Sequence, residues 1–236
     1  MELGRTTNQN MQQKAAVVSG VALLVMTIAA FFAQGYVHSS LVVEGDATTT
    51  LKNIQASQRL FRLEVLGWLI IVIMDLVVSW GFYLFLKPFH AGYALLAGGL
   101  RFLYTVMLAT AVSHLVVTNT IVQHSVGGTS DRVAQQVMDA ITTFEAIWSF
   151  GLIIFGLHLI AVGVVAWKTT RIPKVISYLV VLAGFSYSLI HFMYHFITQL
   201  ENVTGLLELI LMVPMVIGEL GFGIWLLVKG RRVTMD

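Results

Sequence analysis

Long hydrophobic runs recur along the whole chain. Six of them are long enough to cross a bilayer, at approximately residues 15–35, 61–86, 91–119, 143–167, 174–197 and 205–228. A helix needs about 20 apolar residues to cross ~30 Å of hydrocarbon, because it rises 1.5 Å per residue. The pattern therefore predicts an all-α, polytopic membrane protein with six transmembrane helices. We expect residues 1–236 to form a single transmembrane helical-bundle domain.

Two polar connections carry a weaker helical pattern. Residues 45–61 contain the cap residue Asp46 followed by apolar positions at helical spacing, and residues 129–144 begin with Thr129 or Ser130 as the N-cap. We expect both segments to extend the second and fourth spans outward as amphipathic helices. The alternative is a pair of helices that lie flat on the lipid surface.

Composition excludes a water-soluble globule. Hydrophobic residues make up 57% of the chain and charged residues only 11%, whereas soluble domains carry roughly 25% charged residues. The absence of cysteine excludes disulfides, thiolate metal sites and cysteine nucleophiles. No phosphate-binding loop, dinucleotide fingerprint or nucleophile elbow occurs. The expected partners are membrane lipids and not nucleic acid, and the pattern makes no prediction about the oligomeric state.

Lysine and arginine are unevenly divided between the two sides of the predicted bundle. Ten lie on the side of the termini: Arg5, Lys14, Lys87, Arg101, Lys168, Arg171, Lys174, Lys229, Arg231 and Arg232. Four lie on the other side: Lys52, Arg59, Arg62 and Arg132. Because cytoplasmic loops carry the excess of basic residues, we expect a multi-pass protein of the cell (plasma) membrane with both termini in the cytoplasm.

Two stretches resemble a known family. They are "LFRLEVLGWLIIVIMDLVVSWGFYLFLKPF" and "FGLIIFGLHLIAVGVVAWKTTRIPKVISYLVVLAGFSY". The pattern elements are Phe61-Arg62, Gly67-Trp68, Asp75, Tyr83, Lys87-Pro88, Arg101, Tyr104, Gly156-Leu157-His158, Pro173 and Gly184 with Tyr187. The chain resembles, over nearly its whole length, the bacterial and archaeal integral-membrane family called domain of unknown function 4386. The resemblance implies a multi-span membrane protein and supplies no activity.

Ionisable residues inside the spans form an inner layer. Its members are Asp75, Arg101, His158 and Glu219, with Tyr187 within reach. Each of the four lies about nine to eleven residues from the end of its span on the side where the chain termini lie. At the helical rise of 1.5 Å per residue, this places each residue ~14–16 Å below the membrane surface. A charge in hydrocarbon costs roughly 2.5–3.5 kcal/mol, so we expect Asp75 and Arg101, on adjacent spans, to form an ion pair. The layer is interpreted as a polar cavity or as a buried structural network.

A second layer lies nearer the opposite face. It contains Glu64, His114, Glu145, His191 and His195, with His38 and Glu208 closer to the surface. His191 and His195 would present two imidazoles on one helix face, as in helical zinc sites. With His114 and either Glu145 or Glu64 they would complete a set of three nitrogens and one oxygen that suits Zn, Fe or Mn. The alternatives are a haem held by His114 and His191, or histidines that face the headgroups. The His191/His195 pair lies outside the family pattern.

Two functional hypotheses follow, with a simpler third. The first is a small-molecule or ion binding or transport-type protein with a polar cavity, in which Pro214 kinks the last span and permits movement. The second is an intramembrane metal-dependent hydrolase that acts on a lipid-like substrate. The third is a structural membrane subunit whose polar groups serve packing alone.

Overall fold

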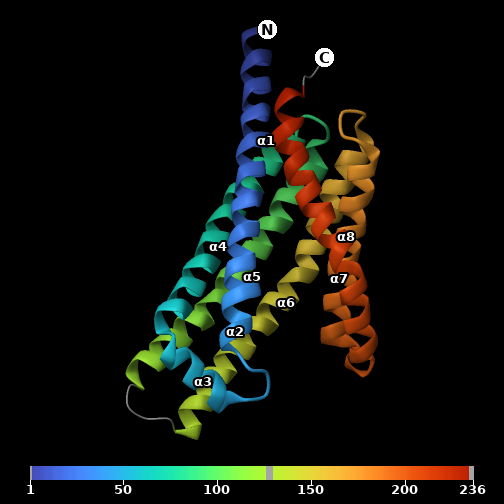
Figure 1. The fold of residues 1–236 in the computed structure, drawn as a ribbon. Coiled ribbons are helices and arrows are strands. Elements are labelled where there is room, and N and C mark those ends of the chain that lie inside the picture. The colour runs from blue at the N-terminus through green and yellow to red at the C-terminus, as the bar shows by residue number, and fades with distance from the viewer. Residues whose placement is uncertain (1, 126–129, 234–236) are drawn as a thin grey trace. The chain divides into compact units, whose positions relative to one another are not determined.

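The computed structural model describes residues 2–125 and 130–233, which are helical apart from short connections (Figure 1). The elements in chain order are α1 (Glu2–Ala30), η1 (Phe31–His38), α2 (Ser39–Leu41), α3 (Ala47–Ala56), α4 (Gln58–Leu86), α5 (Ala91–His124), α6 (Asp131–Lys168), α7 (Lys174–Phe196), η2 (Thr198–Leu200), α8 (Glu201–Val228) and η3 (Gly230–Arg232). The segment η1 is a π-helix, whereas η2 and η3 are 3-10 helices.

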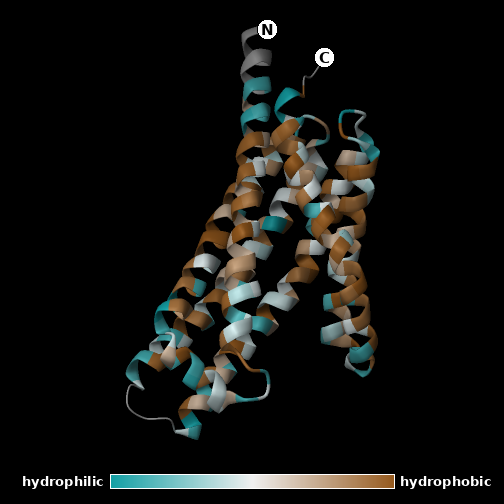
Figure 2. Cartoon of the chain, viewed as in Figure 1, coloured by the Kyte–Doolittle hydropathy of each residue, from teal (hydrophilic) through white to brown (hydrophobic). Residues whose placement is uncertain are grey.

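Within the described residues, six helical stretches are long and apolar enough to cross a membrane. They are Gln9–Leu41, Gln58–Leu86, Ala91–His124, Asp131–Lys168, Lys174–Phe196 and Thr198–Arg232. Their number and order confirm the six predicted spans. Figure 2 shows hydrophobic residues along most of each long helix and hydrophilic residues around α3 and at the connections. The chain is therefore a multi-pass integral membrane protein.

Packing divides the chain into two compact units. Unit 1 comprises Met1–Leu24, Met74–Thr105 and Phe150–Asp236, and unit 2 comprises Val25–Ile73 and Val106–Ser149. The helices α1, α4, α5 and α6 each contribute residues to both units, whereas α7 and α8 belong to unit 1. The single-domain organisation stays a prediction.

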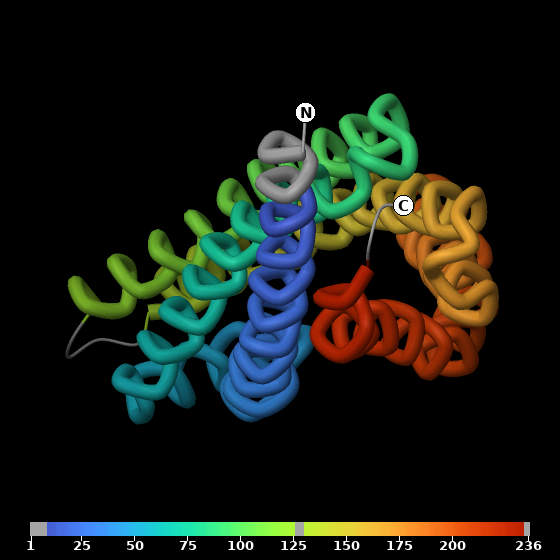
Figure 3. The backbone as a smooth tube through the Cα atoms, turned by 90° about the horizontal axis from the view of Figure 1, so that it is seen from above, coloured from blue at the N-terminus to red at the C-terminus, as the bar shows by residue number. Residues whose placement is uncertain are grey.

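Unit 1 is held together by close helix crossings at glycine. A Cβ built at Gly156 on α6 would lie 2.4 Å from the backbone oxygen of Gly184 on α7. A Cβ at Gly20 would lie 2.5 Å from Leu227, and α1 and α8 run side by side in Figure 3. Small residues at such crossings let backbones approach, which is how membrane helices associate without a hydrophobic driving force between them.

Unit 2 contains the break between α3 and α4. Asp46 caps α3 by accepting a hydrogen bond from the backbone N–H of Thr49, as predicted. Residues 45–61 are largely helical, as predicted, but only Gln58 onward extends the second span, because α3 ends at Ala56 and α4 begins at Gln58. Leu51 and Ile54 are fully buried, so the short helix packs its apolar face inside unit 2. The other predicted extension is confirmed, since α6 begins at Asp131 and runs unbroken into its span.

Candidate functional site

A buried ion pair lies at the centre of the inner layer in unit 1. The guanidinium of Arg101 donates from Nε to Asp75 Oδ1 at 2.8 Å and from Nη2 to the same oxygen at 2.5 Å. Both side chains are 0% exposed. The predicted pairing of Asp75 with Arg101 is therefore confirmed. The attraction between two charges at this distance offsets part of the cost of taking them out of water.

His158 extends this ion pair into a three-residue network. Its Nδ1 lies 2.7 Å from the backbone oxygen of Ala97, which can only accept, so Nδ1 carries the hydrogen. Its Nε2 lies 3.3 Å from Nη1 of Arg101, which can only donate. Both contacts are satisfied only by a neutral imidazole with Nε2 unprotonated. His158 thus supports the arginine as a hydrogen-bond acceptor and adds no charge.

Aromatic rings enclose the Arg101 guanidinium on two sides. Its central carbon lies 5.6 Å from the ring centroid of Phe82 and 5.3 Å from that of Phe155. The same two rings contact the imidazole of His158, at 5.7 and 5.8 Å between centroids. Cation–π attraction strengthens when a site is desolvated. The network is therefore a packed, apolar-walled arrangement, and every residue in it belongs to unit 1.

Tyr187 and Glu219 lie around the network without joining its hydrogen bonds. The Tyr187 ring packs edge-on against Phe155, with 5.2 Å between centroids. The Glu219 carboxylate interacts electrostatically with Arg101, Asp75 and Tyr187. In the part of the chain described, no hydrogen bond joins Glu219 to another residue. The five predicted inner residues therefore belong to one unit, and hydrogen bonds join three of them, Asp75, Arg101 and His158.

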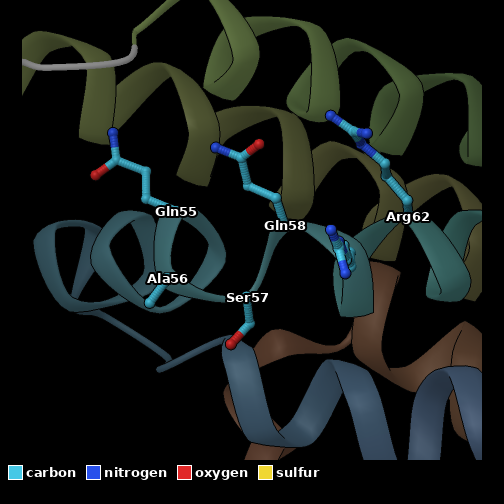
Figure 4. A pocket seen from close by; sticks show the side chains of 6 residues that line it. Gln55, Ala56, Ser57, Gln58 and Arg62 are labelled. Carbon is cyan, nitrogen blue, oxygen red and sulfur yellow. The ribbon is translucent and has the colours of Figure 1, made fainter.

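The surface clefts that the structure describes lie elsewhere. One, of about 360 Å³, lies in unit 2 at the junction of α3 and α4, where Gln55 and Gln58 project to the same side (Figure 4). The other, also about 360 Å³, lies in unit 1 between Arg171 and Val233. None of the five inner residues lines either cleft. The polar cavity stays a prediction. We call the five inner residues, Asp75, Arg101, His158, Tyr187 and Glu219, the inner polar cluster.

The predicted metal set of His114, Glu145, His191 and His195 is divided between the units. The first two belong to unit 2 and the last two to unit 1. Aromatic rings surround the α7 pair: His191 stacks on Tyr187 and His195 meets Phe150 edge-on. Among residues 2–125 and 130–233, no three His, Asp or Glu side chains converge as a metal site. A zinc or other divalent-metal site with these four ligands stays a prediction.

Unit 2 contains a second polar cluster, made of three residues that the sequence analysis placed in the outer layer without pairing them. The Nδ1 of His38 lies 2.7 Å from Glu64 Oε1, and its Nε2 lies 3.0 Å from Glu145 Oε1. The His38 and Glu64 side chains are 5% and 0% exposed, whereas that of Glu145 is 45% exposed. We call these three residues the outer triad.

The π-helix explains why the outer triad escaped sequence reasoning. His38 is the last residue of η1, an eight-residue π segment inside the first span. A π-helix bonds residue i to i+5, so the directions of its side chains depart from the 3.6-residue period. The hydroxyls of Ser39 and Ser40 donate to the carbonyls of Gly35 and Val37 as the segment ends. The available signal was the occurrence of ionisable residues in three different apolar spans.

Comparison with known proteins supports the membrane assignment. Residues 18–230 match the sequence family described as Domain of unknown function (DUF4386), a range that includes both polar clusters. An uncharacterized protein of Archaeoglobus fulgidus is 25% identical over 171 residues, which cover 72% of this chain and 86% of that protein. No solved structure matches the chain significantly. Because the match covers four of the spans completely and most of the first and the last, the chain belongs to the DUF4386 family.

Proposed function

We propose that this integral membrane protein binds or transports a small molecule or ion through the inner polar cluster. The observation that carries the proposal is an imbalance of charge and hydrogen bonds. Arg101 is matched by Asp75, which leaves the Glu219 carboxylate as a second acid without a hydrogen bond among the described residues. Ionisable groups inside spans are costly, and those that transporters retain mark ion or substrate pathways.

The unpaired atoms favour a ligand that donates hydrogen bonds or carries positive charge. Asp75 uses Oδ1 for both contacts to Arg101, and its buried Oδ2 has no hydrogen-bond partner among the described residues. Glu219 adds a second acceptor. Because both are acceptors and His158 is neutral, a cation or an ammonium-type group would complement the cluster. A carboxylate or phosphate ligand would leave these acceptors unpaired.

The last helix supplies a means of movement beside the cluster. Pro214 lies inside α8, five residues before Glu219, and removes one backbone hydrogen bond from the helix. Broken or distorted helices at such positions are typical of transporter binding sites. Gly218 meets α7 closely, since a Cβ there would lie 2.6 Å from the Leu179 oxygen. We infer that α8 bends at Pro214 while its crossing with α7 holds.

A flux assay on reconstituted protein tests the proposal. The purified chain is placed in liposomes that contain a pH-sensitive dye, and gradients of Na⁺, K⁺ or methylammonium are imposed with and without a membrane potential. Wild-type protein is expected to support flux of at least one of these cations or of protons. The Glu219→Gln variant should lose it, whereas Glu201→Gln, an exposed acid at the start of the same helix, should not.

A binding measurement separates a binder from a transporter. A ligand that binds only the folded protein raises its stability by RT ln(1 + [L]/Kd), about 2.7 kcal/mol at 100-fold excess over Kd. Each cation is therefore screened for a rise in the melting temperature of wild-type protein and of Glu219→Gln. Thermal stabilisation without flux would indicate a binding protein. No stabilisation and no flux with any of the probes would overturn the proposal in favour of a structural subunit.

We further propose that both termini lie in the cytoplasm and that the chain resides in the plasma membrane. The support is the division of basic residues between the two sides of the spans, which is nine against four once Arg101, buried inside α5, is left out. Site-directed thiol labelling of the two sides of the spans tests the orientation.

A further inference from the structure

The two hydrogen bonds that join His38 to Glu64 and Glu145 require two hydrogens, which the imidazole and the two carboxyl groups share. An ionised carboxylate can only accept, so each contact needs a hydrogen either on the ring nitrogen or on the carboxyl. One arrangement is an imidazolium between two carboxylates, with a net charge of +1 − 2 = −1. The other is a neutral imidazole with one carboxyl protonated, with a net charge of 0 − 1 = −1. The geometry of the outer triad fits both.

The ring arrangement suits proton transfer and not chelation. Glu64 and Glu145 contact opposite nitrogens of one imidazole, so the ring separates the two carboxylates. A single metal ion cannot touch both acids while the ring lies between them. Imidazole can accept a proton at one nitrogen and release another from the other, which makes histidine the usual proton shuttle in proteins.

Burial gives the outer triad a direction. Glu145 is 45% exposed and follows the polar first turns of α6, whereas Glu64 is completely buried. The Oε2 atom of Glu64 and the indole Nε1 of Trp68 are both buried. Trp68 is 2% exposed and its indole interacts with the Glu64 carboxylate from one turn along α4. The indole N–H donor of Trp68 and the carboxylate acceptor of Glu64 thus lie together at the buried end of the triad.

The surroundings isolate the triad from other charges. Phe144 packs 6.0 Å from the His38 ring and 5.1 Å from Trp68, between centroids. Glu64 on α4 and Glu145 on α6 are the charged groups that act on His38, and α3 and α5 contribute none in the part of the chain described. In such an apolar setting, hydrogen bonds polarise one another and strengthen.

The π-helix is the second structural sign of function. Long π segments are rare, and π-bulges inside α-helices frequently occur at functional sites. Here η1 ends at His38, so the departure from α-helical geometry sets the direction of the imidazole. We propose that Glu145, His38 and Glu64 form a proton relay that carries protons between the exposed face of unit 2 and the buried Glu64 carboxyl. This inference goes beyond the proposed function and does not depend on it.

The step balances without any co-reactant. The O–H bond of protonated Glu145 breaks as an N–H bond forms at Nε2 of His38. The N–H bond at Nδ1 breaks as an O–H bond forms at Glu64 Oε1. The ring ends neutral with its hydrogen on the other nitrogen, and the net charge of the triad is unchanged. One proton has moved from the exposed acid to the buried acid.

Infrared difference spectroscopy after a pH jump tests the relay on full-length protein in liposomes. Wild-type protein should show a protonated-carboxyl band that shifts in D₂O and disappears in Glu64→Gln. Glu44→Gln, which removes an exposed acid of the same unit, should leave the band unchanged. In His38→Gln the side chain still forms hydrogen bonds but cannot pass a proton. Protonation of Glu64 should therefore slow by about 10²-fold or more, the usual worth of a positioned acid–base group.

Two results would overturn the relay. The first is uptake of a proton by Glu64 that is equally fast in His38→Gln and wild type. The second is the absence of a protonated carboxyl in wild type at every pH. The second would identify the triad as a permanent ion pair that serves packing alone. Should a variant fail to fold, ¹⁵N-histidine solid-state NMR of wild-type protein gives the same decision. A relay requires His38 to exchange between its two neutral forms, and an imidazolium that never changes excludes it.

Discussion

Removal of the Asp75 carboxylate should be among the most damaging single changes in unit 1. In Asp75→Leu the Arg101 guanidinium keeps its charge at 0% exposure and loses both contacts to Oδ1, at 2.5 and 2.8 Å. Breaking a buried pair by removing one partner costs about 3–5 kcal/mol, because the remaining charge is uncompensated. For a chain of this size, each kcal/mol shifts Tm by about 2–4 °C, so we expect Tm to fall by roughly 6–20 °C.

The double variant distinguishes the pair from simple loss of packing. Replacing both members by apolar residues is often neutral or stabilising, so Asp75→Leu/Arg101→Met should recover most of the lost stability. The assay is thermal unfolding in detergent, followed by the fluorescence of the five tryptophans. Asp139→Leu, an exposed acid on α6, should stay within about 0.5 kcal/mol of wild type. Additive losses in the double variant, or an unchanged Tm in Asp75→Leu, would refute the reasoning.

Three further predictions follow from the structure. Gly156→Ala places a Cβ 2.4 Å from the α7 backbone and should lower Tm, whereas Gly99→Ala has open space and should gain about 0.5–1 kcal/mol in the same assay. Hydrogen bonds from the first turn of α3 lower the pKa of Asp46. Its cap therefore stabilises α3 above the unfolded pKa of Asp46 and is lost as pH falls through the lowered one. Amide protection in α3, corrected for the intrinsic exchange rate at each pH, should therefore fall in acid but stay constant in Asp46→Asn. In this cysteine-free chain, an impermeant thiol reagent on whole cells should label Glu44→Cys but not Lys229→Cys, and the reverse pattern would contradict cytoplasmic termini.

The spans and the Asp75–Arg101 pair were predictable because both follow from the large free-energy cost of placing polar or charged groups in hydrocarbon. Twenty apolar residues in a row have few alternatives to a membrane helix. An acid and a base at matching depth on neighbouring spans must compensate each other, which is why Asp75 and Arg101 were paired correctly. The chain's departures from regular helix were less accessible. Burial of Leu51 and Ile54 against unit 2 decides the break at Ser57, and only tertiary packing reveals it.

The outer triad was unpredictable for a different reason. Glu64 and Glu145 were assigned to the outer layer, and His38 was placed nearer the surface. Depth can be counted from a span end, but the face of a helix can be counted only while its period holds. The π segment ends that regularity between Phe31 and His38. The division of His114 and His191 between two units was equally invisible, because periodicity does not describe which helices pack together.

The π segment also has a consequence for how relatives should be aligned. A π turn holds one residue more than an α turn, so a relative with one residue fewer between positions 31 and 38 could retain the same span. A one-residue gap inside this membrane helix is therefore structurally reasonable, although gaps in spans are ordinarily penalised. An ungapped alignment would rotate everything beyond the segment by about 100° per residue. It would then match His38 with a position on another face of the relative's helix.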